Sequence, residues 1–180
     1  MKLPGVLTLF AAVSLAQTTD LPQRRLLETA ASRSGAQIIW SMPAGSLEGG
    51  GLHAGFTVLA VVDSANPGQQ VRGIRVDLAQ KDWKGVVYID EDDVPVLKKG
   101  AVSLARWQAD YAKAPATPTF STHAPEDDQV RPLYFGYRRT GDDATLYLGG
   151  AGVPSFLFKG PMPTDLAAIF ARATQELSKP

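Results

Sequence analysis

Glycine and proline occur along the whole chain and set the strongest limit on its fold. The 180 residues include 17 Gly and 13 Pro. Both end regular elements, because Gly adopts backbone conformations that other residues avoid and Pro lacks an amide hydrogen. Their spacing predicts many short strands and two longer helices.

The amino-terminal segment has the three parts of a secretory signal peptide. Lys2 precedes an almost entirely apolar run over residues 3–12, and Ser14 and Ala16 are the small residues that a signal peptidase recognises. The run is shorter than the roughly 20 apolar residues of a membrane span, and no other segment approaches that length. We expect residues 1–16 to be a signal peptide and residues 17–180 to form one secreted or periplasmic domain without a membrane span.

The chain contains no cysteine. Disulfides, thiolate zinc sites, iron–sulfur clusters and a cysteine nucleophile are therefore excluded. An exported domain without disulfides depends on its hydrophobic core for stability. Removing 16 of the 180 residues leaves 164, and 44% of the chain is apolar, which is enough for a single core.

The charges are balanced, which bears on the class of partner. Lys and Arg number 18 against 18 Asp and Glu, and loss of Lys2 leaves 17 basic and 18 acidic residues, a net charge of −1. Nucleic-acid-binding proteins carry a basic surface because phosphate neutralisation supplies most of their affinity. We expect no nucleic-acid partner.

Strand patterns fill the first half up to one helix. Residues 55–62 are apolar on both faces, as in a central strand, and an Asn-Pro-Gly turn is expected at 66–68. From residue 71 to residue 78 apolar and polar side chains alternate, which predicts a strand with one solvent-exposed face. This strand is expected to pair with its predecessor as a hairpin. A strand at 86–89 precedes an acidic cluster, which suits the start of an amphipathic helix over 91–111.

The second half repeats this order after a proline-rich hinge at 114–118. A tight hairpin turn is expected at 140–143 and a flexible glycine link at 149–152. A Pro-Thr-Asp sequence opens an amphipathic helix over residues 163–177. Four segments read as strands, namely residues 119–123, 133–138, 144–148 and 155–158.

The segment before Gly55 allows two structures. Leu26, Leu27, Ala30 and Ala31 have helical spacing, whereas Ser34-Gly35 followed by an apolar run indicates a turn into a strand. We favour a short hairpin within residues 23–54.

These elements predict an α+β fold with an antiparallel sheet built from two strand-rich halves. The halves are about 23–113 and 117–178, and a helix closes each. Superposing the helices places Leu97 on Ile169, so both should be buried, with each helix covering its own half. Shared amphipathic patterning alone would also produce this match between the helices. The sequence therefore does not decide whether the two halves arose by internal duplication.

Three stretches resemble a group of uncharacterised, mostly exported bacterial proteins, namely residues 33–39, 88–94 and 156–177. In that group a Tyr-Ile-Asp strand end precedes an acidic helix start. The resemblance implies an order of elements and no chemistry. The chain departs from it at Pro95, and at Met162 in place of a capping serine. The order of strands is also similar to Whirly-type single-stranded nucleic-acid-binding proteins, but the charge balance argues against their function.

Few residues carry recognisable catalytic patterns. His53 and His123 are the only candidate bases for a serine triad, and no Gly-x-Ser-x-Gly sequence is present, so both are expected to be ordinary loop histidines. The glycines at 49–51 and 149–152 lack the Lys-Ser/Thr of a phosphate-binding loop and are interpreted as flexible connections. We assign no catalytic, cofactor-binding or metal-binding residue.

Acidic residues cluster at 91–93, 126–128 and 142–143. Solvated surface runs are the expected interpretation. A glycosidase needs two carboxylates about 5 to 10 Å apart across a cleft. The alternative function is therefore a carboxylate-dependent hydrolase that uses Glu126, Asp127 and Asp128.

Aromatic residues alternate along the hairpin of the second half, so some of them must point outward. They are Tyr134, Phe135, Tyr137 and Tyr147. An exposed aromatic face suits binding. The leading hypothesis is a non-catalytic exported domain that binds an unknown protein, a glycan or a small ligand without a cofactor.

Export gives a direct prediction. Protein recovered from the periplasm or the medium should have the intact mass of a chain that begins at Gln17, with or without cyclisation of that residue. Mass spectrometry of secreted material tests this. Recovery of cytoplasmic protein that begins at Met1 would show that the segment is not a cleaved signal.

Overall fold

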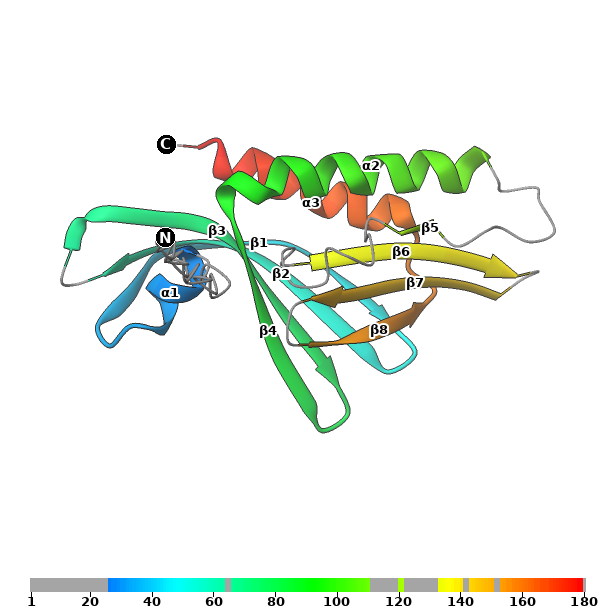
Figure 1. Cartoon of the computed structure of the whole chain (residues 1–180), viewed down its shortest axis with the longest axis horizontal. Coiled ribbons are helices and arrows are strands. Elements are labelled where there is room, and N and C mark those ends of the chain that lie inside the picture. Colours follow the sequence, from blue (N-terminus) through cyan, green and yellow to red (C-terminus); the bar gives the residue numbers. More distant parts are fainter. Residues whose placement is uncertain are drawn as a thin grey trace, which may run out of the picture.

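The strands of the described residues form two four-stranded antiparallel sheets, one from each half of the chain, and two long helices of this part of the chain lie across them (Figure 1). The computed structural model describes residues 26–63, 66–110, 120–121, 133–140, 143–150 and 153–179. The predicted α+β class with antiparallel strands is confirmed, and the strands divide between two sheets.

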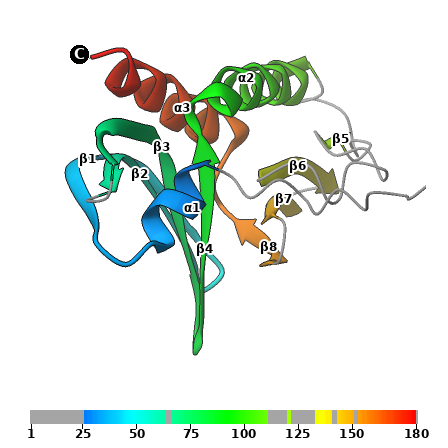
Figure 2. The same cartoon turned by 60° about the vertical axis from the view of Figure 1, so that its left-hand side comes forward.

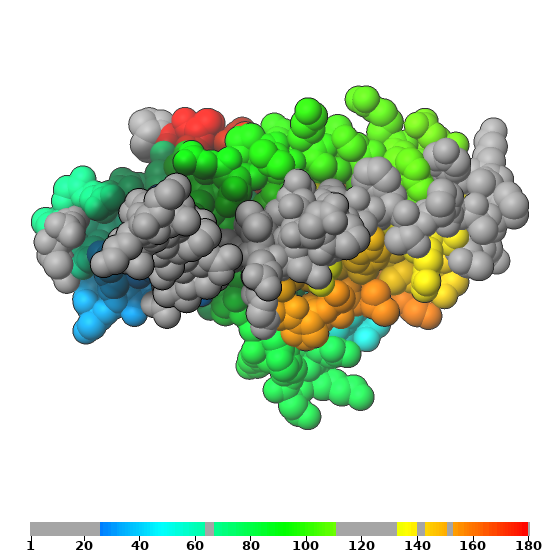
Figure 3. Space-filling model, in the orientation of Figure 1, coloured from blue at the N-terminus to red at the C-terminus, as the bar shows by residue number. Residues whose placement is uncertain are grey.

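The first sheet has the strand order β1-β2-β3-β4. In β3, Ile74, Val76 and Leu78 are buried while the alternating Arg75 and Asp77 lie on the other face, as predicted. The β3–β4 turn projects from the body of the molecule (Figure 3). The elements of this half are α1 (Leu26–Ser32), β1 (Ala36–Gly49), β2 (Leu52–Asp63), β3 (Asn66–Gln80), β4 (Trp83–Asp90), the 3-10 turn η1 (Glu91–Asp93) and α2 (Val94–Asp110).

The second sheet has the order β5-β6-β7-β8. The predicted hairpin is present, with Thr140 paired to Asp143 at its tip. Among the helices of the described residues, none is both long and apolar enough to cross a bilayer. The elements are β5 (Phe120–Ser121), β6 (Leu133–Thr140), β7 (Asp143–Gly150), β8 (Val153–Lys159) and α3 (Pro163–Leu177).

The expected short hairpin within residues 23–54 is wrong for its first part, since Leu26–Ser32 form a helix. Two interactions distant in sequence favour the helix. Leu27 and Ala30 pack against Leu59 and Val61 on the sheet. The Asp90 carboxylate accepts hydrogen bonds from the backbone N–H of Leu26 (3.1 Å) and of Leu27 (2.8 Å) and so caps the helix start.

The glycine sequence 49–51, expected to be a flexible connection, is the tip of the long β1–β2 hairpin. Gly49 pairs with Leu52, and Gly50 and Gly51 between them have φ values of 64° and 77°. A two-residue hairpin loop with positive φ at both positions favours glycine.

The expected turn at 66–68 and the first two residues of the expected glycine link at 149–152 belong to strands, while residues 151 and 152 lie outside the described part of the chain. Asn66 already pairs with Asp63, so β3 includes the Asn-Pro-Gly sequence, whose extra residues lie at a register irregularity. β7 continues to Gly150, and a Cβ at Gly149 would collide with the ring of its partner Tyr134. The sequence patterns missed both because cross-strand pairing overrides local turn preference.

One hydrophobic core joins both sheets and both long helices. The Phe170 ring of α3 lies 6.0 Å from the Phe56 ring of β2 and 5.9 Å from the Phe135 ring of β6. Between the sheets, the Trp83 ring lies 5.0 Å from the Phe156 ring. The two halves therefore share one core.

α2 and α3 lie side by side over the sheets (Figure 2). α3 packs against β1, β2 and β3 of the first half, and α2 packs against β6 of the second. The expectation that each helix covers its own half is therefore wrong. The reason is the shared core, which draws the apolar face of α3 onto the other half.

Leu97 and Ile169 are buried, as the superposed helices predicted. Truncating either to Ala should lower the free energy of unfolding by about 2 to 5 kcal/mol, because apolar contact is lost and a cavity remains. Chemical denaturation measures this. Lys99→Ala on the exposed side of α2 is the control and should change stability by less than about 0.5 kcal/mol. An Ile169→Ala effect as small as that of the control would contradict a core role for α3.

The Tyr137 phenol gives a pH prediction. Its ring is buried and lies 6.5 Å from the Trp107 ring. Burial raises its pKa above the ordinary 10.0, and Arg139 opposes the shift. The neutral phenol therefore stabilises the fold at lower pH, and this contribution is lost as the pH rises through the raised pKa. Urea denaturation up to about pH 11 should show a steeper loss of stability in the wild type than in Tyr137→Phe. Parallel curves would contradict this.

Candidate functional site

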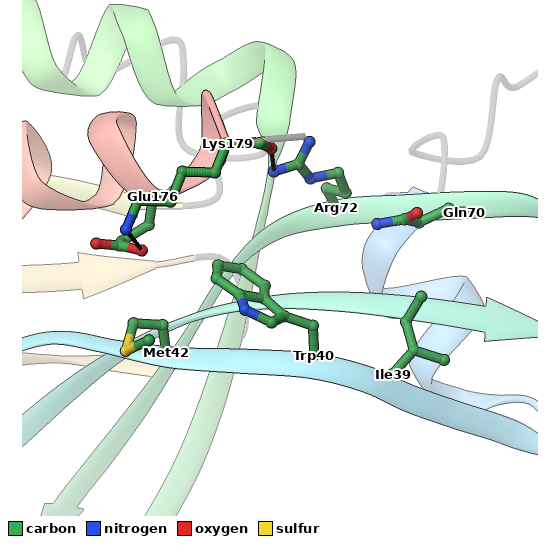
Figure 4. Close-up of a pocket in the computed structure, with 7 residues that line it drawn as sticks. All are labelled: Ile39, Trp40, Met42, Gln70, Arg72, Glu176 and Lys179. Atoms are coloured by element: carbon green, nitrogen blue, oxygen red, sulfur yellow. Dashed lines mark hydrogen bonds and ion pairs between the residues drawn. The ribbon is translucent and has the colours of Figure 1, made fainter.

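A cavity of about 390 Å³ lies between the sheet and the last turn of α3 (Figure 4). Strands β1 and β3 supply one side, and the end of α3 supplies the other. The lining residues combine apolar, aromatic and charged side chains: Ile39, Trp40, Met42, Gln70, Arg72, Glu176 and Lys179.

Strand register brings the two largest of these side chains to the same face. Trp40 pairs with Ala60, and Ala60 pairs with Arg72, so the three residues form one row across the sheet. Residues two strands apart are about 10 Å apart along such a row. Ala60 between them is fully buried, while Trp40 and Arg72 both line the cavity. A register shift between Ile38 and Trp40 accompanies this arrangement.

Arg72 lacks an acidic partner among the described residues. Its Nη2 donates a hydrogen bond to the Lys179 carbonyl oxygen at 2.9 Å, while its Nε is buried without a hydrogen-bond partner. Arg33 and Arg75, by contrast, pair with Asp63 at 2.8 Å and with Asp77 at 2.6 Å. Arg72 thus places a partly buried positive charge beside the cavity without a compensating carboxylate from that part of the chain.

Glu176 in the last turn of α3 and Lys179 just beyond the helix form a second pair of charged groups. The Lys179 Nζ lies 2.7 Å from Glu176 Oε2, and the Glu176 carboxylate is largely buried. Because these two charges compensate each other, Arg72 leaves the lining with one net positive charge.

Arg72 and Trp40 were not among the residues predicted to have a functional role, although the sequence contains a signal for Arg72. Arg72 is in phase with Ile74, Val76 and Leu78, which form the apolar face of β3, and not with the polar residues of the opposite face. A charged residue in phase with a core face indicates a special environment. The sequence alone could not supply its neighbours, because the register with β1 and the position of α3 arise from tertiary packing.

The histidine and acidic candidates do not converge on this cavity in the described residues. His53 is exposed, with its Nδ1 3.2 Å from Glu48 Oε1. Asp143 is exposed and lies 3.4 Å from the Lys159 Nζ. Glu91–Asp93 form the 3-10 turn before α2, whereas His123, Asp142 and the Glu126–Asp128 cluster lie outside the described residues. The described ranges contain no group of three or more His, Cys, Asp or Glu arranged to hold a metal ion.

The aromatic residues of the second hairpin divide between its faces. Phe135 and Tyr137 are buried in the core. Tyr134 and Tyr147 alternate with them, and the Tyr134 hydroxyl lies 2.6 Å from Ser155 Oγ. The prediction that some of these rings point away from the core is confirmed.

Comparison of the chain with protein-family models, with curated proteins and with solved structures finds no match.

Proposed function

We propose that this chain is a non-catalytic exported binding domain, and that its ligand is a small molecule held in the cavity between β1, β3 and α3. The observation that carries the proposal is the cavity itself, which is lined by both Trp40 and Arg72, an arginine without an acidic partner among the described residues (Figure 4).

Size and lining support a small molecule over a protein or a glycan. A volume of about 390 Å³ is within the range of roughly 300 to 1,000 Å³ that is typical of small-molecule sites. Such sites combine apolar walls with a few polar groups that orient the ligand. Here Ile39, Trp40 and Met42 supply the walls, and Gln70 and Arg72 supply the polar groups.

The charged groups at the cavity support binding more than catalysis. A carboxylate-dependent hydrolase needs two carboxyl groups across a cleft. Glu176 is the only carboxylate in the described lining, and Lys179 already neutralises it. The alternative hydrolase, which rests on Glu126, Asp127 and Asp128, is a hypothesis that needs a test of its own.

A library of metabolite-sized compounds, screened by ligand-observed NMR, tests the binding proposal. We expect ligands whose signals change with the wild type and lose most of that change with Trp40→Ala, because the indole forms a wall of the cavity. Ile39→Asp should also abolish binding. Ile39 is 54% exposed, so that variant should fold normally.

Leu157→Ala is the control, since Leu157 is exposed on β8 and does not line the cavity. It should bind as the wild type does. The absence of any hit, or hits that survive both cavity variants, would overturn the proposal. Turnover of ester or glycoside substrates that is lost in Asp127→Ala and Asp128→Ala would replace it with the hydrolase.

A further inference from the structure

We infer that the ligand of this cavity is a small anionic amphiphile, with a carboxylate or similar anion at Arg72 and an apolar or aromatic body against Trp40. This inference rests on the proposed function and names the class of ligand. Its basis is the combination, in one cavity, of an apolar wall and a guanidinium that has no carboxylate partner among the described residues.

The charge distribution selects an anion. Taking a positive charge partly out of water costs free energy unless hydrogen bonds and an opposite charge compensate it. Arg72 has one hydrogen bond, to a neutral carbonyl, and no carboxylate partner in the described part of the chain. A ligand anion would supply that missing charge.

The guanidinium also favours a planar oxygen anion. Arginine presents donors in a rigid fork that matches the two oxygens of a carboxylate, and hydrogen bonds between ions are stronger than neutral ones. Nη2 already contacts the Lys179 carbonyl, which fixes the orientation of the fork. The end of α3 therefore positions Arg72 before a ligand arrives.

The rest of the lining selects an apolar body next to the anion. Trp40 packs partly against the core and projects its indole toward the space below Lys179 and Arg72 (Figure 4). Ile39 and Met42 extend the apolar surface along β1. A flat or aliphatic group on this surface would leave water while its charged end stays at Arg72.

A cationic ligand fits less well. The one carboxylate of the described lining belongs to Glu176, which is largely buried and bonded to Lys179. An ammonium group would have to break that ion pair and would also meet the charge of Arg72.

Probes that share a body and differ in charge test the inference. Isothermal titration calorimetry would compare indole-3-acetate, indole-3-acetamide and tryptamine, with octanoate and octanamide as the aliphatic pair. We expect each anion to bind about tenfold or more tightly than its amide, and tryptamine to bind most weakly. Raising the salt concentration should weaken the anions and not the amides.

Arg72→Gln should remove most of this preference for anions and leave amide binding within about threefold of wild type, because the apolar wall is unchanged. Arg75→Gln is the matched control: Arg75 is on the same strand, lies on the opposite face and pairs with Asp77. It should leave the preference intact. Circular dichroism melting of both variants verifies that they fold.

The outcomes separate the two proposals. Amides that bind as tightly as the anions, or an anion preference that survives Arg72→Gln, would overturn the ligand class and leave the binding function standing. If neither these probes nor the compound library bind, both proposals are wrong.

Discussion

The contacts of Phe170 with Phe56 and Phe135 are the interaction on which the rest of the structure depends. They join α3 to a strand of each sheet, so the two halves cannot separate without exposing this ring. Full burial of an aromatic side chain contributes about 1.5 to 3 kcal/mol. The contact also explains why α3 is not confined to its own half, since its largest apolar residue has one partner in each sheet.

The candidate site is a consequence of that packing. α3 begins where the Asp165 carboxylate accepts a hydrogen bond from the Met162 backbone N–H at 2.7 Å, and Phe170 fixes its middle in the core. The last turn must then lie above β1 and β3, where Glu176 and Lys179 face Trp40. Asp165 takes part in the helix start that a serine was expected to cap. The helix therefore forms without a capping serine at position 162, and its last turn still lies over the cavity.

Regular periodicity made most elements predictable, and long-range contacts account for the rest. The alternation in β3 and the amphipathic spacing of α2 and α3 reflect burial on one face, which a single sequence records directly. Asp90 shows the limit. Its acidic cluster correctly indicated a helix start at η1 and α2, yet its carboxylate caps α1, a helix more than 60 residues earlier. No local pattern contains such a partner, and the same is true of the row in which Ala60 pairs with Trp40 on one side and with Arg72 on the other.

Arg72 and Asp63 illustrate how a charge on a mostly apolar strand should be interpreted. Asp63 is buried at the end of β2, and Arg33, in the turn after α1, neutralises its charge. The fold itself therefore explains the role of Asp63. Arg72 sits in phase with a core face, and within the described chain only a carbonyl oxygen compensates it. A fold gains little stability from a half-satisfied guanidinium, because desolvation offsets one hydrogen bond. We therefore attribute the arginine at this position to the binding of a ligand anion, which would neutralise its charge and accept further hydrogen bonds from it.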